Sequence, residues 1–117
     1  MTSLETAKLA AKALSDKKGL DIKVIRINDI SVLSDYIVIA TGTSSTQVKA
    51  MADFVEYQLE EEGIKVSRIE GYRSNTWILM DYIDVIVHVF MDETREFYDL
   101  ERLWQDGEAI DISDVID

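Results

Sequence analysis

The sequence predicts one domain of the α/β (α+β) class, a mixed five-stranded sheet flanked by helices. The first reason is size, because 117 residues with 47% hydrophobic content suffice for one core. The second is order, since helical and β-branched segments follow each other as helix, strand, strand, helix, three strands, helix. The third is the lack of proline, which leaves these elements uninterrupted. We expect a single domain over residues 1–105 and an acidic tail over residues 106–117.

The N-terminal segment predicts a helix followed by a strand. Thr2 and Glu5 have the spacing of a capping box, and apolar residues recur at helical spacing until Gly19, so we expect a helix over residues 3–18. Residues 22–27 mix β-branched side chains with Lys and Arg, which is typical of a partly exposed strand toward an edge of the sheet.

The next segment predicts the centre of the sheet. Residues 36–40 are apolar at every position, which is typical of a strand covered on both faces. Ser44 and Gln47 then form a second capping pattern, and apolar residues mark one face of a helix that ends near Gly63.

The C-terminal half predicts three further strands and a last helix. Short apolar runs indicate strands over residues 65–70, 76–80 and 85–90, and helical spacing returns over residues 92–104. Residues 36–40, 77–80 and 85–90 are apolar on both faces, and only three helices are available to cover the two faces of the sheet. We therefore expect part of the sheet to be left for a partner or a second copy.

The charge of the chain limits its partners. Twelve basic and 23 acidic residues give a formal net charge of −11, which repels phosphate, so we expect little direct nucleic-acid contact. Residues 51–117 hold eighteen of the acidic residues and five of the basic ones. This half should therefore present an acidic face, suited to a basic protein or to cations.

The chain lacks cysteine, which excludes disulfides, thiolate metal sites and thiol nucleophiles. Its first residues have no signal-peptide character, and no apolar run approaches the ~18 residues of a membrane span. We therefore expect a soluble cytoplasmic protein without membrane contact.

Residues 42–45, Gly-Thr-Ser-Ser, join a buried strand to a helix, where backbone N–H groups can hold a phosphate. The segment lacks the lysine of a P-loop, the G-x-G-x-x-G pattern and a G-x-S-x-G elbow. A plain helix cap is the simpler interpretation.

Asp81 and Asp84 flank Tyr82 and Ile83 in a predicted turn. In a two-residue hairpin loop their side chains would stand roughly 4.5–5.5 Å apart and repel each other, unless a cation or a partner's Lys or Arg lies between them. The alternative is a wider, solvated turn, because β-branched Ile83 resists the positive φ of tight hairpins.

His88, the only histidine, shares a strand face with Ile86 and Phe90, which favours a hydrogen-bonded structural role over catalysis. Its acidic neighbours lack any recognised ligand spacing, so we expect no metal site. Trp77 begins a buried-looking strand and is either a core residue or an interface anchor.

Taken in order, these motifs resemble the ribosomal silencing factor family, also called RsfS, YbeB or Iojap. The resemblance covers about residues 5–105. It is carried by DYIVIATGTSS (35–45), Glu70, Gly71, Trp77, Asp81, DVIVHVF (84–90), Arg95, Tyr98 and LERLW (100–104).

The resemblance implies a factor that binds the large ribosomal subunit through ribosomal protein L-fourteen and blocks joining of the small subunit. Translation then falls when nutrients are short, and organellar relatives aid large-subunit assembly. It also implies a nucleotidyltransferase-like fold without that activity, no catalytic residue, no cofactor and possible homodimers. The residues it assigns to the partner contact are Trp77, Asp81, Tyr82, Asp84, His88 and Tyr98.

The chain departs from the family pattern at two places: Thr46 and Gln47 stand where members often carry Arg-His, and Ile83 where they often carry Gly. One alternative is a nucleotide-binding or nucleotidyltransferase-like enzyme that uses residues 42–45, with Mg²⁺ on Asp81 and Asp84. A second alternative is a dimeric scaffold for a different basic protein.

Overall fold

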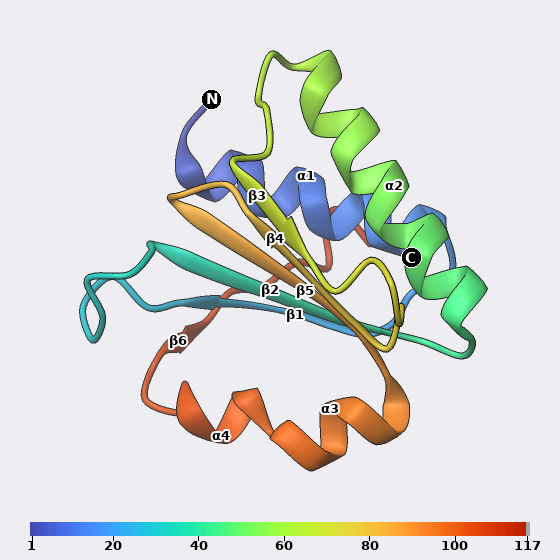
Figure 1. Ribbon diagram of the computed structural model, residues 1–117. Helices are drawn as coiled ribbons and strands as arrows, with labels where there is room; N and C mark the ends of the chain where they lie inside the picture. Colours follow the sequence, from blue (N-terminus) through green and yellow to red (C-terminus); the bar gives the residue numbers. More distant parts are fainter. Residues whose placement is uncertain (117) are drawn as a thin grey trace.

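The computed structural model describes residues 1–116, which form one six-stranded sheet with helices on both faces (Figure 1). The elements, in chain order, are α1 (Ser3–Asp16), β1 (Leu20–Arg26), β2 (Tyr36–Gly42), α2 (Ser45–Glu61), β3 (Arg68–Glu70), β4 (Trp77–Asp81), β5 (Val85–Met91), α3 (Asp92–Tyr98), α4 (Leu100–Leu103) and β6 (Glu108–Ala109). The strands lie in the order β3-β4-β5-β2-β1-β6. Strands β2 and β5 are parallel and every other pair is antiparallel, so the predicted class, a mixed sheet flanked by helices, is confirmed.

The strand count differs from the prediction by one. Strand β6 has two residues in an acidic segment without an apolar pattern, so the sequence gives no sign of it. It pairs only with Ile25 and Arg26 of β1. Gly107 permits this approach, because a Cβ there would lie 2.6 Å from the Ile25 side chain.

The last predicted helix is also interrupted. Residues 92–104 form two short helices because Asp99 adopts a left-handed conformation, with φ 47°, between α3 and α4. Aspartate tolerates this region better than most residues. The first helix ends at Asp16, two residues before the expected end, and the strand predicted over residues 65–70 is regular only over Arg68–Glu70.

Local signals at the helix starts are confirmed. Thr2 Oγ1 accepts a hydrogen bond from the Glu5 N–H at 3.1 Å, and the Glu5 carboxylate accepts one from the Thr2 N–H at 2.9 Å. Ser44 Oγ accepts from the Gln47 N–H at 3.1 Å. All seven residues of β2 are buried, as expected for a central strand.

Helices α1 and α2 cover one face of the sheet and form the larger core with it (Figure 1). Ala10 and Ala11 of α1 are fully buried, and their small side chains let the helix pack closely. Ile112 is buried against this core, and Ile110 and Val115 pack beside it, so part of the acidic C-terminal segment lies on the same face.

Helices α3 and α4 lie on the opposite face (Figure 1). A smaller cluster there joins Ile37, Ile39 and Phe90 of the sheet to Leu100 and Trp104. Farther out, toward β3, the side chains on this face are only half-buried. No helix among residues 1–116 is long and apolar enough to cross a membrane.

Candidate functional site

Trp77 lies on the sheet face that α3 covers only in part. The antiparallel register of β4 and β5 pairs Trp77 with Phe90 and Leu79 with His88, which puts all four side chains on one face. The indole Nε1–H donates a hydrogen bond to His88 Nδ1 at 3.0 Å. The Trp77 ring lies 5.0 Å from Phe90 and 4.6 Å from Tyr98, measured between ring centroids. Contacts with His88, Phe90 and Tyr98 therefore fix the position of the Trp77 side chain, which remains half-buried.

His88 supports Trp77. Its imidazole is buried, with 6% exposed surface, and burial lowers the pKa of His88 to about 4. The ring is neutral at pH 7, and because Nδ1 accepts the indole hydrogen, Nε2 carries the proton. This matches the predicted hydrogen-bonded structural role.

Asp81 ends the same strand face. Its carboxylate accepts a hydrogen bond from the Ile83 N–H at 2.8 Å and lies 3.7 Å from the Arg68 guanidinium. The turn closes with a hydrogen bond from the Tyr82 N–H to the Val85 carbonyl at 2.9 Å. The two central residues are therefore Ile83 and Asp84, so Asp81 and Asp84 do not stand opposite each other as a two-residue Tyr82-Ile83 loop would require.

Ile83 nevertheless adopts the positive φ that its side chain disfavours. Its φ is 74°, and the Asp84 N–H donates to the Tyr82 carbonyl at 2.9 Å, which makes Ile83 the central residue of a γ-turn. The positive-φ form of this turn is rare and strained. The alternative of a wider turn, based on the resistance of a β-branched residue to positive φ, is therefore wrong here.

The structure does not place Tyr82 on the Trp77 face. Its side chain is buried in the core under α1 and α2, and its hydroxyl has no hydrogen-bond partner among the described residues. Burial raises the pKa of Tyr82, and the carboxylates of Glu56 and Glu60 raise it further. Asp84 is exposed at the turn. Of the predicted contact residues, Trp77, Asp81 and Tyr98 thus share one surface, and His88 is buried on the same sheet face, hydrogen-bonded to Trp77.

Two residues of this surface were not predicted from the sequence. Leu79 lies between Trp77 and Asp81 on β4, and Ile86 of β5 is the cross-strand partner of Asp81; both are half-buried on the same face. The spacing of Trp77, Leu79 and Asp81 could have identified Leu79, because residues two apart along a strand lie on the same face. We call Trp77, Leu79, Asp81, Ile86 and Tyr98 together the Trp77 surface.

The Trp77 surface combines aromatic and apolar area with one carboxylate, Asp81, and borders Arg68 and Glu70 of β3. Arg68 of β3 lies 3.6 Å from Glu70 and 3.7 Å from Asp81, so these charges form a pair network on the strand edge. A central aromatic residue with a polar rim is typical of protein interfaces. Among residues 1–116, no group of three or more His, Asp or Glu side chains could hold a metal ion.

The junction at residues 42–45 is occupied by its own hydrogen bonds. Gln47 Oε1 accepts from the Thr43 N–H at 2.6 Å and from Thr43 Oγ1 at 2.9 Å, and Gln47 Nε2 donates to the carbonyls of Lys17 and Lys18. The N–H groups of Thr43 and Gln47 at this junction are thus already bonded. This geometry favours the helix-cap interpretation.

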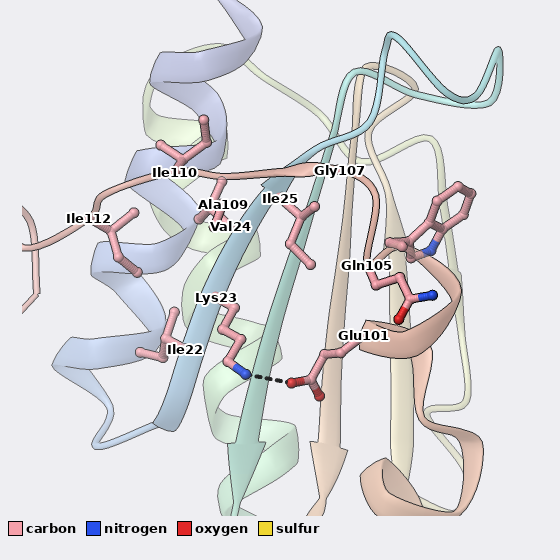
Figure 2. A pocket seen from close by; sticks show the side chains of 11 residues that line it. Ile22, Lys23, Val24, Ile25, Glu101, Gln105, Gly107, Ala109, Ile110 and Ile112 are labelled. Atoms are coloured by element: carbon pink, nitrogen blue, oxygen red, sulfur yellow. Dashed lines mark hydrogen bonds and ion pairs between the residues drawn. The ribbon is translucent and has the colours of Figure 1, made fainter.

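A cavity of about 350 Å³ lies elsewhere, between β1, α4 and β6 (Figure 2). Isoleucines from β1 and from the C-terminal segment line one side of it, and Glu101 and Gln105 line the other (Figure 2). The ammonium of Lys23, which also lines the cavity, lies 2.7 Å from the Glu101 carboxylate. Since that cation is already paired and the lining is largely apolar, the cavity does not favour a nucleotide.

Comparisons with known proteins agree on one family. The family described as "Ribosomal silencing factor during starvation" matches residues 1–117. Ribosomal silencing factor RsfS of Halalkalibacterium halodurans is 37% identical over 116 residues, which cover 99% of each chain. A crystal structure of a protein from Chromobacterium violaceum superposes with a TM-score of 0.88 at 39% identity, over 97% of this chain and 93% of that one. The mouse protein named "Mitochondrial assembly of ribosomal large subunit protein 1" is 31% identical over 94 residues, 78% of this chain and 41% of that protein.

Proposed function

Because this chain belongs to the ribosomal silencing factor family, we propose that it binds the large ribosomal subunit through ribosomal protein L-fourteen and blocks joining of the small subunit. Its effect is to repress translation in the cytoplasm under nutrient limitation, and it also aids large-subunit assembly. The observation that carries this proposal is the Trp77 surface, an aromatic and apolar strip with the carboxylate of Asp81, which α3 covers only in part.

Charge supports a protein partner on the ribosome. A molecule with net charge −11 is repelled by ribosomal RNA, so it must dock on a basic protein patch. In this proposal Asp81 accepts hydrogen bonds from a Lys or Arg of that patch. The opposite charges of the two surfaces also raise the association rate.

Each predicted contact residue has a role in this proposal. Trp77 is the anchor, and Tyr98 and the buried His88 hold its ring in place. Asp81 and the exposed Asp84 provide negative charge. Tyr82 contributes by fixing the turn from the core side, because its side chain is buried.

The block is steric and needs no catalysis. The described chain measures 33 × 32 × 28 Å, so a copy docked on the face where the subunits meet fills the space that the small subunit needs. The family is a ribosomal silencing family and not a known enzyme family. The enzyme alternative has less support, because the Thr43 N–H at its phosphate site is already bonded to Gln47.

The same surface supports a homodimer as a second proposal. A two-fold interface must be self-complementary, and Asp81 on this surface with the neighbouring Arg68 of β3 provides both signs of charge beside apolar area. Sedimentation equilibrium would show a dimer for the native chain and a monomer for Trp77→Ala.

Binding to purified large subunits tests the main proposal. Trp77→Ala should raise the dissociation constant roughly 30-fold, equal to about 2 kcal/mol, because it removes the anchor. Tyr57→Ala removes an exposed aromatic side chain from α2, on the other face, and should bind as the native chain does.

Asp81→Asn provides a second variant that keeps the side-chain oxygen for the turn and removes the charge. It should weaken binding and flatten its salt dependence. Co-sedimentation of the native chain with small subunits, or unimpaired subunit joining in excess factor, would refute the proposal.

A further inference from the structure

A second exposed apolar cluster lies at one end of the sheet, away from Trp77. Ile30, Val32 and Leu33 in the loop between β1 and β2 are 46%, 103% and 69% exposed. Ile83 in the turn between β4 and β5 is 65% exposed. We call these four residues the loop-tip patch.

The topology places the loop and the turn together. Strands β2 and β5 are parallel and begin at the same end of the sheet, where β1 and β4 finish (Figure 1). The N–H groups of Asp35 and Tyr36 both donate to the Asp84 carbonyl, at 2.9 and 3.1 Å. These two hydrogen bonds attach the loop directly to the turn.

The loop has internal hydrogen bonds that hold its apolar tip outward. The Ile27 carbonyl accepts from the N–H groups of Ile30 and Ser31, both at 2.9 Å, and the Ile27 N–H donates to the Asp35 carbonyl at 2.8 Å. Ser31 Oγ accepts from the Leu33 N–H at 3.0 Å. Val32 and Leu33 belong to neither core cluster, so their side chains do not serve the fold.

The patch carries two costs in the free molecule. Apolar side chains face water, and Ile83 is held at a φ of 74° that a β-branched residue disfavours. Strained positions of this kind concentrate at functional sites.

The charged side chains within the two segments that form the patch are all acidic, while Arg26 borders the loop and Arg68 lies 3.7 Å from Asp81. Residues 27–36 and 81–85 contain four aspartates, Asp29, Asp35, Asp81 and Asp84, and no Lys or Arg. An apolar tip between carboxylates fits an apolar recess bordered by basic side chains, and it repels phosphate.

We propose that the loop-tip patch is a second docking surface, which inserts into an apolar recess bordered by Lys and Arg on the same ribosomal protein surface that receives Trp77. This inference rests on the proposed function. Strand β4 leads from Trp77 to Asp81 over about 13 Å at ~3.3 Å per residue, so one interface of ordinary size reaches both.

The test measures binding of the full chain to purified large subunits. The double variant Val32→Ser with Leu33→Ser should raise the dissociation constant at least tenfold while circular dichroism and the unfolding midpoint stay unchanged. The control is Leu20→Ser, which changes a half-exposed leucine at the opposite end of β1 and should alter binding less than twofold. Asp29→Asn should weaken binding and reduce its salt dependence.

The outcomes separate this inference from the proposed function. Native binding that Trp77→Ala weakens and the double variant leaves unchanged would overturn the loop-tip patch and leave the proposed function intact. If the native chain does not bind large subunits, both the loop-tip patch and the proposed function are overturned. Equal binding to ribosomal RNA stripped of protein would also refute the stated partner chemistry.

Discussion

Trp77 and His88 are joined across two neighbouring strands by a hydrogen bond of 3.0 Å from the indole N–H to Nδ1 of the imidazole. The bond requires a neutral imidazole, because a protonated ring has no acceptor nitrogen. The orientation of the half-buried Trp77 ring therefore depends on the protonation state of the buried His88 ring.

The stability of the fold should fall in mild acid because of His88. Its pKa is lowered to about 4 in the folded chain, against about 6.5 when unfolded, so the unfolded chain binds more protons between these values. The contribution is fully present above pH 6.5 and is lost as the pH falls toward 4. Its size is on the order of 3 kcal/mol.

His88→Gln isolates this effect. Glutamine offers an acceptor to the indole and does not titrate, so the difference in unfolding free energy between pH 7 and pH 4.5 should be smaller in the variant than in the native chain. Urea unfolding at both pH values measures it. An identical pH dependence in the two chains would show that His88 does not contribute.

Arg95 should be a large contributor to stability despite its charge. It is buried, and it donates to Glu101 at 2.8 Å, to Thr41 Oγ1 at 2.7 Å and to the Asp21 carbonyl at 2.8 Å, which ties α3 and α4 to the sheet. The hydrogen bond from Arg95 lowers the pKa of Glu101 to about 2.

Arg95→Met should cost about 3 kcal/mol of unfolding free energy, because it leaves Glu101, Thr41 and Asp21 without this donor. Arg102→Met, on the exposed side of α4, should change stability by less than about 0.5 kcal/mol. Equal losses in the two variants, measured by urea unfolding, would contradict the role assigned to Arg95.

The features that were predicted correctly from the sequence depend on residues close together in the chain. The Thr2 and Glu5 capping box involves neighbours three residues apart, and the burial of β2 follows from an uninterrupted apolar run. Neither depends on distant parts of the chain.

Features set by tertiary contacts were not predictable. The Trp77–His88 bond depends on the β4–β5 register, and a shift of one residue would move the whole face. Tyr82 was assigned to the partner surface with Trp77, yet its side chain enters the core at the turn. Strand β6 forms because its two residues pair with the free edge of β1. The sequence of those two residues does not itself indicate a strand.

Gln47 should stabilise the contact between α1 and α2. Its amide links Thr43, before α2, to the carbonyls of Lys17 and Lys18, after α1. Gln47→Ala should therefore lower the unfolding free energy by about 1–2 kcal/mol. Gln105→Ala, at an exposed position, is the control. A thermal midpoint for Gln47→Ala equal to that of the control would show that the bridge is not stabilising.

Ile83→Gly should make the protein more stable, although most substitutions by glycine do the opposite. The positive φ of 74° costs a residue with a Cβ roughly 1–2 kcal/mol, and glycine is free of that cost. Glycine loses about 0.5–1 kcal/mol more backbone entropy, and the exposed side chain offers little burial to lose, so the net gain is about 0.5–1 kcal/mol. Ile83→Ala keeps the Cβ and hence the strain, so its thermal midpoint should stay near that of the native chain. If the alanine variant were the more stable of the two, the γ-turn would not be strained, and the argument that Ile83 is held there for binding would lose its basis.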